Sequence, residues 1–92
     1  MFTLDRQVRI HPNVVSTELG DGETALLHLG SKTYYSLNLT GARIWQGLQQ
    51  ELPLEEISRQ IQAEFEVDSQ QAERSVGRLV DELLRHQIVQ SV

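Results

Sequence analysis

Residues 33–45 read TYYSLNLTGARIW, and this stretch decides the fold because a strand turns directly into a helix within it. A threonine and two tyrosines open the stretch, and both residue types favour a half-buried, pleated surface. Thr40 is placed to cap a helix, because its hydroxyl can accept an N–H bond of the first turn. Apolar side chains then recur at helical spacing at Ala42, Ile44, Trp45 and Leu48. We therefore expect strands before this point and helices after it.

Upstream of this stretch, the sequence predicts two further strands, at residues 14–19 and 24–29, before the strand at 33–37. Gly20 and Gly22 offer positive-φ positions for the first turn. The pair Gly30-Ser31 predicts a tight hairpin with glycine in its first position. Three consecutive strands joined by short turns form an antiparallel meander. Alternation assigns these side chains to its core face: Leu27, Leu29, Tyr35 and Leu37.

An N-terminal arm, residues 1–12, is predicted to precede a single domain at 13–92. Val8 and Ile10 alternate with polar residues, which indicates a short strand or an extended segment. Pro12 ends regular pairing there because it has no backbone N–H.

Three helices are predicted downstream. The first covers about 40–50, the second begins at Pro53, and the third is capped by Asp68 or Ser69 and runs to about Gln87. The apolar stripe of the second helix is Leu54, Ile57, Ile61 and Phe65; that of the third is Ala72, Val76, Leu79 and Leu83, with Val80 and Leu84 beside it. Trp45 is expected to anchor the core, and Ile88-Val89 to pack back or add a short strand. The predicted class is α+β, a winged-helix-like fold of three strands followed by three helices.

Composition excludes several classes of protein. Ninety-two residues make one domain, and the absence of cysteine excludes disulfides and thiolate chemistry. The net charge of −5 opposes binding to nucleic acid or to an anionic membrane. No apolar run approaches the ~20 residues of a membrane-spanning helix, and the N-terminus does not resemble a secretory signal. We expect a cytoplasmic protein.

Catalytic and metal-binding patterns are missing from the sequence. His11, His28 and His86 stand apart with no metal-ligand spacing, so a solvated or structural role is expected. No serine elbow and no phosphate-binding glycine loop is found. Glu55-Glu56 suits a helix N-terminus rather than an acid/base pair. The sequence therefore predicts neither an enzyme, nor a cofactor, nor a metal site.

Two alternatives use the same predicted fold. A winged-helix DNA-binding module would need a basic recognition helix, and the third helix carries Arg74, Arg78 and Arg85. Acidic residues on the same helix offset these arginines, which favours a solvated face of ion pairs. A dimerisation or scaffold module would pair the free strand edge with a second copy. The expected state is a monomer or a weak dimer.

The edge of the third strand is the preferred site. An unpaired edge offers backbone N–H and C=O groups to another strand, and natural edges are usually protected. Residues 33–37 contain no proline and no charge. A peptide is expected to add there as a strand, with the third helix as the second wall of a groove. The competing interpretation is that the arm or a dimer partner covers this edge.

The chain also resembles the PqqD-like family. The resemblance rests on Leu26–Leu29, on the block Tyr34-Tyr35-Ser36-Leu37-Asn38 with Thr40-Gly41-Ala42 and Ile44-Trp45, on Leu54–Ile57, on Phe65–Asp68 and on Val80–Leu84. It covers about residues 14–89. Members are small domains that recognise the precursors of ribosomally made, post-translationally modified peptides. The block is similar to that of leader-binding proteins in lasso-peptide pathways.

The resemblance implies a non-catalytic protein that binds the leader region of a precursor peptide by strand addition. It implies as partners the leader peptide and a modifying enzyme or leader peptidase, to which the precursor is presented. The strand residues that it implies for the peptide site are Thr33, Tyr34, Tyr35, Ser36 and Leu37. On the third helix it implies Gly77, Val80, Asp81 and Leu84 as the wall, with Arg74 and Arg78 facing acidic leader residues. Asn38, Thr40, Gly41 and Trp45 are expected to be structural.

Overall fold

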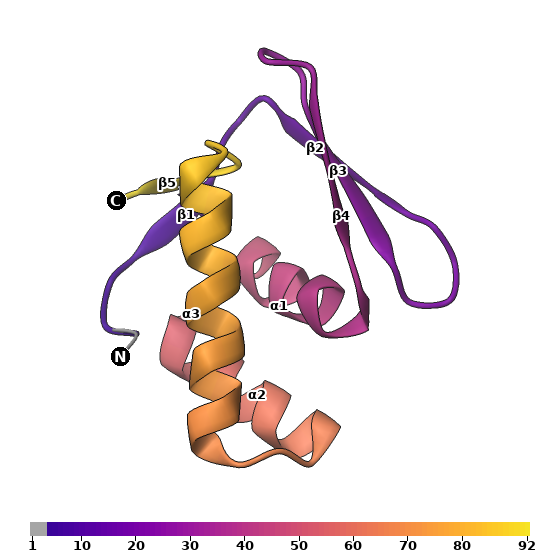
Figure 1. Cartoon of the computed structure of the whole chain (residues 1–92). Coiled ribbons are helices and arrows are strands. Elements are labelled where there is room, and N and C mark those ends of the chain that lie inside the picture. Colours follow the sequence, from indigo (N-terminus) through magenta and orange to yellow (C-terminus); the bar gives the residue numbers. More distant parts are fainter. Residues whose placement is uncertain (1–3) are drawn as a thin grey trace.

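The computed structural model describes residues 4–92. Its elements are β1 (Val8–Ile10), β2 (Val14–Glu18), β3 (Thr24–His28), β4 (Thr33–Leu37), α1 (Leu39–Gln49), α2 (Leu54–Phe65), α3 (Ser69–Arg85) and β5 (Val89–Ser91). The sheet β2-β3-β4 stands to one side of the three helices (Figure 1). The predicted α+β fold, an antiparallel meander followed by three helices, is confirmed.

Of the two turns predicted for the meander, the first is confirmed and the second is wrong. Gly20 and Gly22 adopt φ of 79° and 80°, as predicted for the first turn. The tight turn predicted at Gly30-Ser31 is wrong, because the loop between β3 and β4 spans 29–32 and the positive φ falls on Lys32. The imidazole of His28 explains this loop, since its Nδ1 accepts the backbone N–H groups of Gly30 and Ser31 at 3.1 and 3.3 Å.

The core face of β3 also differs from the prediction. Leu26 is fully buried, whereas Leu29 is 46 % exposed and Leu27 is half-buried on the outer face. Apolar residues occupy both faces of this strand, so alternation alone chose the wrong one. The pairing with β4 decides which face of β3 is buried, because Leu26 lies opposite Tyr35 on the inner face. The assignment of Tyr35 and Leu37 to the inner face is correct, and Leu37 is 3 % exposed.

A side-chain cap starts α1 at Asn38, and not at Thr40 as predicted. The Oδ1 atom of Asn38 accepts the N–H of Gly41 at 2.9 Å. Asn38 directly follows β4 and keeps the extended backbone that a cap residue needs. The cap of α3 is Asp68, one of the two predicted candidates, whose Oδ1 accepts the N–H of Gln71 at 2.8 Å.

The end of α3 comes two residues earlier than predicted. Gln87 adopts a left-handed φ of 59°, and the N–H of Ile88 bonds back to the carbonyl of Leu83 at 2.8 Å. This is the usual way in which a helix satisfies its last carbonyls. Ile88 is then fully buried, as expected for a tail that packs back on the core.

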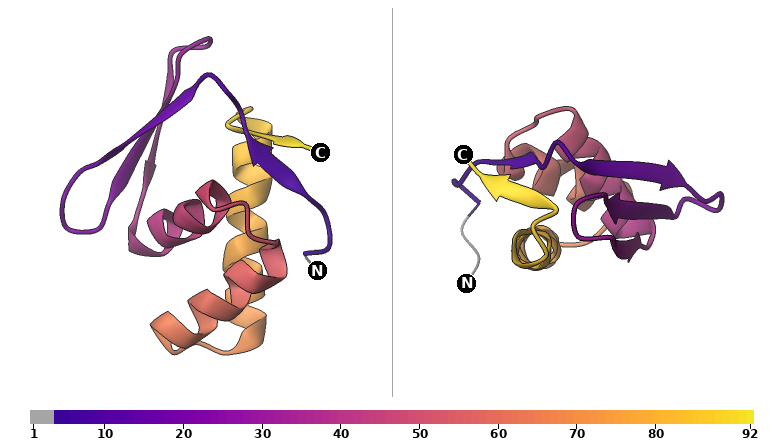
Figure 2. Two further views of the ribbon diagram at one scale, coloured as in Figure 1. Left: turned by 180° about the vertical axis from the view of Figure 1, so that it is seen from behind. Right: turned by 90° about the horizontal axis from the view of Figure 1, so that it is seen from above.

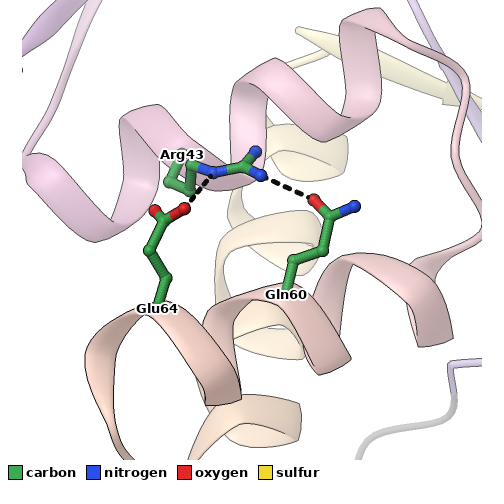
Figure 3. Close-up of polar contacts among 3 residues, drawn as sticks. All are labelled: Arg43, Gln60 and Glu64. Carbon is green, nitrogen blue, oxygen red and sulfur yellow. Dashed lines mark hydrogen bonds and ion pairs between the residues drawn. The ribbon is translucent and has the colours of Figure 1, made fainter.

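The helices pack closely around one core. Its members are Leu26, Leu37, Ala42, Ile44, Trp45, Leu48, Leu54, Ile57, Ile61, Ala72, Val76, Val80, Leu83, Ile88 and Val89. Gly47 brings α1 against α2, since a Cβ there would lie 2.6 Å from Cγ1 of Ile57. Arg43 on α1 also donates to Glu64 at 3.0 Å and to Gln60 at 2.7 Å, both on α2 (Figure 3). These contacts hold α1 against α2.

A two-stranded ribbon joins the two ends of the described chain. β1 pairs antiparallel with β5, with Ile10 opposite Val89, and the ribbon lies beside α3 (Figure 2). Arg6 extends the contact through an ion pair with Asp81 on α3, at 2.6 Å. The strands expected near Val8 and Val89 are therefore present, and they pair with each other. Residues 1–3 of the predicted arm lie outside the described residues, and the domain boundary after residue 12 stays a prediction.

No helix within residues 4–92 has the length and apolar character needed to cross a membrane. Arg59 on α2 pairs with Glu56 one turn earlier on the same helix. There, the hydrogen bond to Glu56, and then its charge, raise the pKa of Arg59. The guanidinium is charged at any ordinary pH, so this shift creates no pH switch.

Candidate functional site

The backbone of β4 presents unused hydrogen-bonding groups along one edge of the sheet. The N–H of Leu29 bonds to the carbonyl of Asn13, so the odd-numbered residues of β3 point their backbone groups toward β2. The even-numbered residues of β3 therefore bond to β4, through the partners Thr33, Tyr35 and Leu37. It follows that the N–H and C=O groups of the two intervening residues of β4 point outward.

Those two residues are Tyr34 and Ser36, and both are exposed. Among residues 4–92, no strand pairs with β4 on this side, because the sheet order ends there and β1 and β5 form a separate sheet. The row of outward groups therefore matches the spacing that an added strand needs. The Tyr34 side chain, 74 % exposed, stands on the outer face of the sheet.

A groove of about 440 Å³ runs between this edge and α3. Its lining residues are Tyr35, Ser36, Leu37, Asn38, Thr40, Gly41, Ile44, Ser75, Arg78, Leu79 and Glu82. They come from β4, from the first turns of α1 and from one flank of α3. The groove is thus built where the strand turns into the helix, within residues 33–45.

The floor of the groove is apolar and closely packed. Leu37 and Ile44 are buried beneath it, at 3 % and 1 % exposure. Gly41 allows α1 to approach β4, since a Cβ there would lie 3.3 Å from Cβ of Leu37. The cap bond from Gly41 to Asn38 fixes this corner. The floor offers a site for an apolar side chain.

The wall of the groove is the flank of α3 that carries Ser75, Arg78, Leu79 and Glu82. These positions are spaced i, i+3, i+4 and i+7, which is one continuous face of a helix. The ring of His86, just past the end of α3, lies 5.6 Å from the ring of Tyr35, centroid to centroid. This contact brings the end of α3 close to β4.

The structure brings some of the predicted site residues together and separates others. Three of the predicted strand residues line the groove: Tyr35, Ser36 and Leu37. Thr33 and Tyr34 are on the same strand but do not line the groove. Of the predicted helix residues, only Arg78 lines it. Val80 is fully buried and Gly77 is buried beside it, so both belong to the core. Packing against the other helices occupies their face of α3, which leaves no surface for a ligand.

The remaining predicted wall residues, Arg74, Asp81 and Leu84, do not line the groove. Asp81 pairs with Arg6 beside the terminal ribbon, and Leu84 packs partly buried against the core. Arg74 is exposed but does not line the groove. The wall residues Ser75, Leu79 and Glu82 were not predicted from the sequence. Their helical spacing was readable, but which flank of the helix faces β4 was not.

No histidine or cysteine is among the residues that line the groove. No group of three or more His, Cys, Asp or Glu within residues 4–92 is placed to hold a metal ion. The centroids of the His28 and His11 rings lie 4.5 Å apart, with the ring planes tilted by 46°. The Nδ1 of His28 accepts two backbone N–H bonds from the β3–β4 loop. His28 thus has a structural role, as expected.

A second hollow, of about 570 Å³, lies under residues 4–9 and beside the α1–α2 connection. It is larger than the groove at β4, and its walls include the charged residues Asp5, Arg6 and Glu51. None of its lining residues belongs to the sheet β2-β3-β4. The groove at β4 is the better site because it combines an apolar floor with an unpaired strand edge.

The chain is similar to a known protein family and to two solved structures. The family model for coenzyme PQQ synthesis protein D (PqqD) matches residues 23–89. TbiB1, solved in complex with the TbiA(beta) leader peptide, is 35 % identical, with a TM-score of 0.84 over 89 % of this chain and 94 % of that one. A lasso peptide synthetase B1 complexed with the leader peptide is 27 % identical, with a TM-score of 0.82 over 91 % and 98 %. No curated protein sequence matches. Because the family model covers more than half of the sequence, the chain belongs to the PqqD family.

Proposed function

We propose that this protein binds the leader region of a ribosomally made precursor peptide, which adds as a strand to β4 in the groove beside α3. The observation that carries the proposal is the pair of outward-facing backbone positions at Tyr34 and Ser36, set directly beside an apolar groove. Strand addition uses backbone bonds for affinity and side-chain pockets for specificity. Both solved relatives are complexes with leader peptides, which supports the same role here.

The proposed site comprises β4 with the flank Ser75, Arg78, Leu79 and Glu82 of α3. The protein acts without catalysis and presents the bound precursor to a modifying enzyme or a leader peptidase. The DNA-binding alternative gains no support from α3, because its exposed surface carries charges of both signs. Self-pairing through β4 is the competing use of the same edge.

Amide hydrogen exchange tests the proposal at single residues. A leader peptide encoded beside this protein is titrated into 15N-labelled protein, and exchange is followed by NMR. We expect new protection at the N–H groups of Tyr34 and Ser36, since both lack a partner in the sheet. The N–H groups of Thr33, Tyr35 and Leu37 already face β3, so their protection should change less.

Other exchange patterns would contradict the proposal. Protection at Ser16 and Glu18 instead would place the peptide on the β2 edge. Protection at Tyr34 and Ser36 that depends on protein concentration and needs no peptide would indicate self-pairing. No new protection with any encoded peptide would remove the case for leader binding.

A further inference from the structure

Two charged side chains, Arg78 and Glu82, line the groove beside β4. Both are exposed. Residues 4–92 contain three ion pairs, Arg6–Asp81, Arg43–Glu64 and Arg59–Glu56, and neither groove charge takes part in them. Asp81, the neighbour of Glu82, is already paired. Arg78 and Glu82 are therefore charges that the described fold does not use.

Their order along the helix is the less favourable one for an ion pair between them. A helical pair at i, i+4 is more favourable when the acid precedes the base, and here Arg78 comes first. No ion pair within 4.0 Å joins them in the structure. Both side chains remain available to a ligand in the groove.

Their spacing matches that of a strand. Four residues of helix rise about 6 Å. Two residues of an extended chain span about 6.7 Å, and their side chains point to the same face. A peptide strand lying between β4 and α3 therefore meets Arg78 and Glu82 with side chains two positions apart, on the face that points toward α3.

The direction of the groove assigns each charge to a position along β4. The contact of Tyr35 with His86 places the end of α3 near the middle of β4. β4 runs from the hairpin toward α1, and α3 runs the opposite way (Figure 1). Glu82, one turn before His86, is thus nearer Tyr35, whereas Arg78 is nearer the end of β4 at Leu37.

From this arrangement we infer that Arg78 and Glu82 select peptides by charge order, which rests on the proposed function of the groove. The preferred strand carries an acidic and a basic side chain two residues apart. The acid faces Arg78 near the end of β4, and the base faces Glu82 near Tyr35. For a peptide that adds antiparallel to β4, the order is acid first, because such a peptide enters at the Leu37 end.

Selection from a display library of random fourteen-residue peptides tests the inference without a known ligand. The wild type, the charge-swapped variant Arg78→Glu with Glu82→Arg, and the edge variant Ser36→Pro are used as baits. With the wild type as bait, we expect peptides with one order of the two charges, acid-x-base or base-x-acid, to be enriched about threefold to tenfold over the other order. This size is typical of two partly exposed ion pairs. The charge-swapped protein should reverse this preference.

Arg74→Glu is the matched control, because it makes the same charge change as Arg78→Glu on the same helix, outside the groove. It should leave the preferred order unchanged. If wild type enriches peptides that Ser36→Pro does not, but with no charge order, then the inference is overturned while strand addition stands. The same holds if the charge swap fails to reverse the order. If wild type and Ser36→Pro enrich the same peptides, strand addition itself is contradicted.

Discussion

β2 and β4 are the two outer strands of the same sheet, and each leaves alternate backbone groups without a strand partner among residues 4–92. On β2 these positions are Ser16 and Glu18, while the N–H of Val14 already bonds to the carbonyl of His11 at 3.1 Å. On α1, the side chain of Gln49 makes a long contact of 3.4 Å with Ser16 of β2. β4 has instead an apolar floor and a helical wall.

The comparison shows that an unpaired edge is not by itself a binding site. Backbone groups on β2 and β4 are chemically alike, and water can satisfy them in both places. The groove at β4 adds buried apolar contact and side-chain selection, which set a specific ligand apart from chance pairing. The charged Glu18 on β2 also discourages strand addition there.

Paired proline substitutions give the largest expected effect. Ser36→Pro removes an outward N–H from β4, and Glu18→Pro removes the corresponding N–H from β2. Because the lost hydrogen bond is accompanied by a clash of the ring with the incoming strand, we expect Ser36→Pro to weaken leader binding by about thirtyfold or more. Glu18→Pro should stay within about twofold of wild type, since no peptide pairs there. Calorimetric titration measures both.

Ser36→Ala is the control for loss of the hydroxyl, and urea unfolding checks that each proline variant is folded. Equal losses in Ser36→Pro and Glu18→Pro would erase the distinction between the two edges.

Neighbouring positions on α3 separate the wall of the groove from the core. Leu79→Ala removes apolar contact in the groove and should weaken leader binding by about tenfold. Val80→Ala leaves a cavity in the core and should lower the free energy of unfolding by about 1–3 kcal/mol. Binding titrations and urea unfolding are measured on both variants. The assignment of the flank fails if Val80→Ala reduces affinity in the folded protein and Leu79→Ala does not.

The cap at Asn38 tests how firmly the corner of the groove is held. Asn38→Ala removes the bond to Gly41 and should cost about 1 kcal/mol of unfolding free energy. Asn38→Asp keeps a cap oxygen and should retain most of the stability. Thr40→Ala should have the smaller effect, which would reverse if Thr40 were the true cap. Thermal unfolding measures all three variants.

The far flank of α3 should give the smallest effect. Asp81→Asn breaks the ion pair with Arg6. The side chain of Arg6 is 33 % exposed and that of Asp81 is 41 % exposed. Solvent screening limits such pairs, so the expected loss of stability is about 0.2–1 kcal/mol. Leader affinity should be unchanged within error in a titration. A clear loss of affinity would move the binding surface toward the terminal ribbon.

The sequence by itself determined the elements and the edge. The β4 stretch, three helices and two glycine positions of the first turn follow from local chemistry: alternation, helical spacing, and backbone freedom. The absence of proline or charge in β4 is also a local fact, and it indicates this strand as the candidate site. The conformational preferences of neighbouring residues predict these features, because each feature depends on residues that are close in the chain.

Tertiary structure alone decided how the elements face one another. It buried Leu26 in place of Leu27, paired β1 with β5, and turned the Leu79 flank of α3 toward β4 instead of the Asp81 flank. It also decided that Tyr34 and Ser36, and not Tyr35, point their N–H groups outward. A helix with apolar side chains on neighbouring faces, or a strand with leucines on both faces, has more than one acceptable orientation. Only the summed packing of the whole core selects one of them.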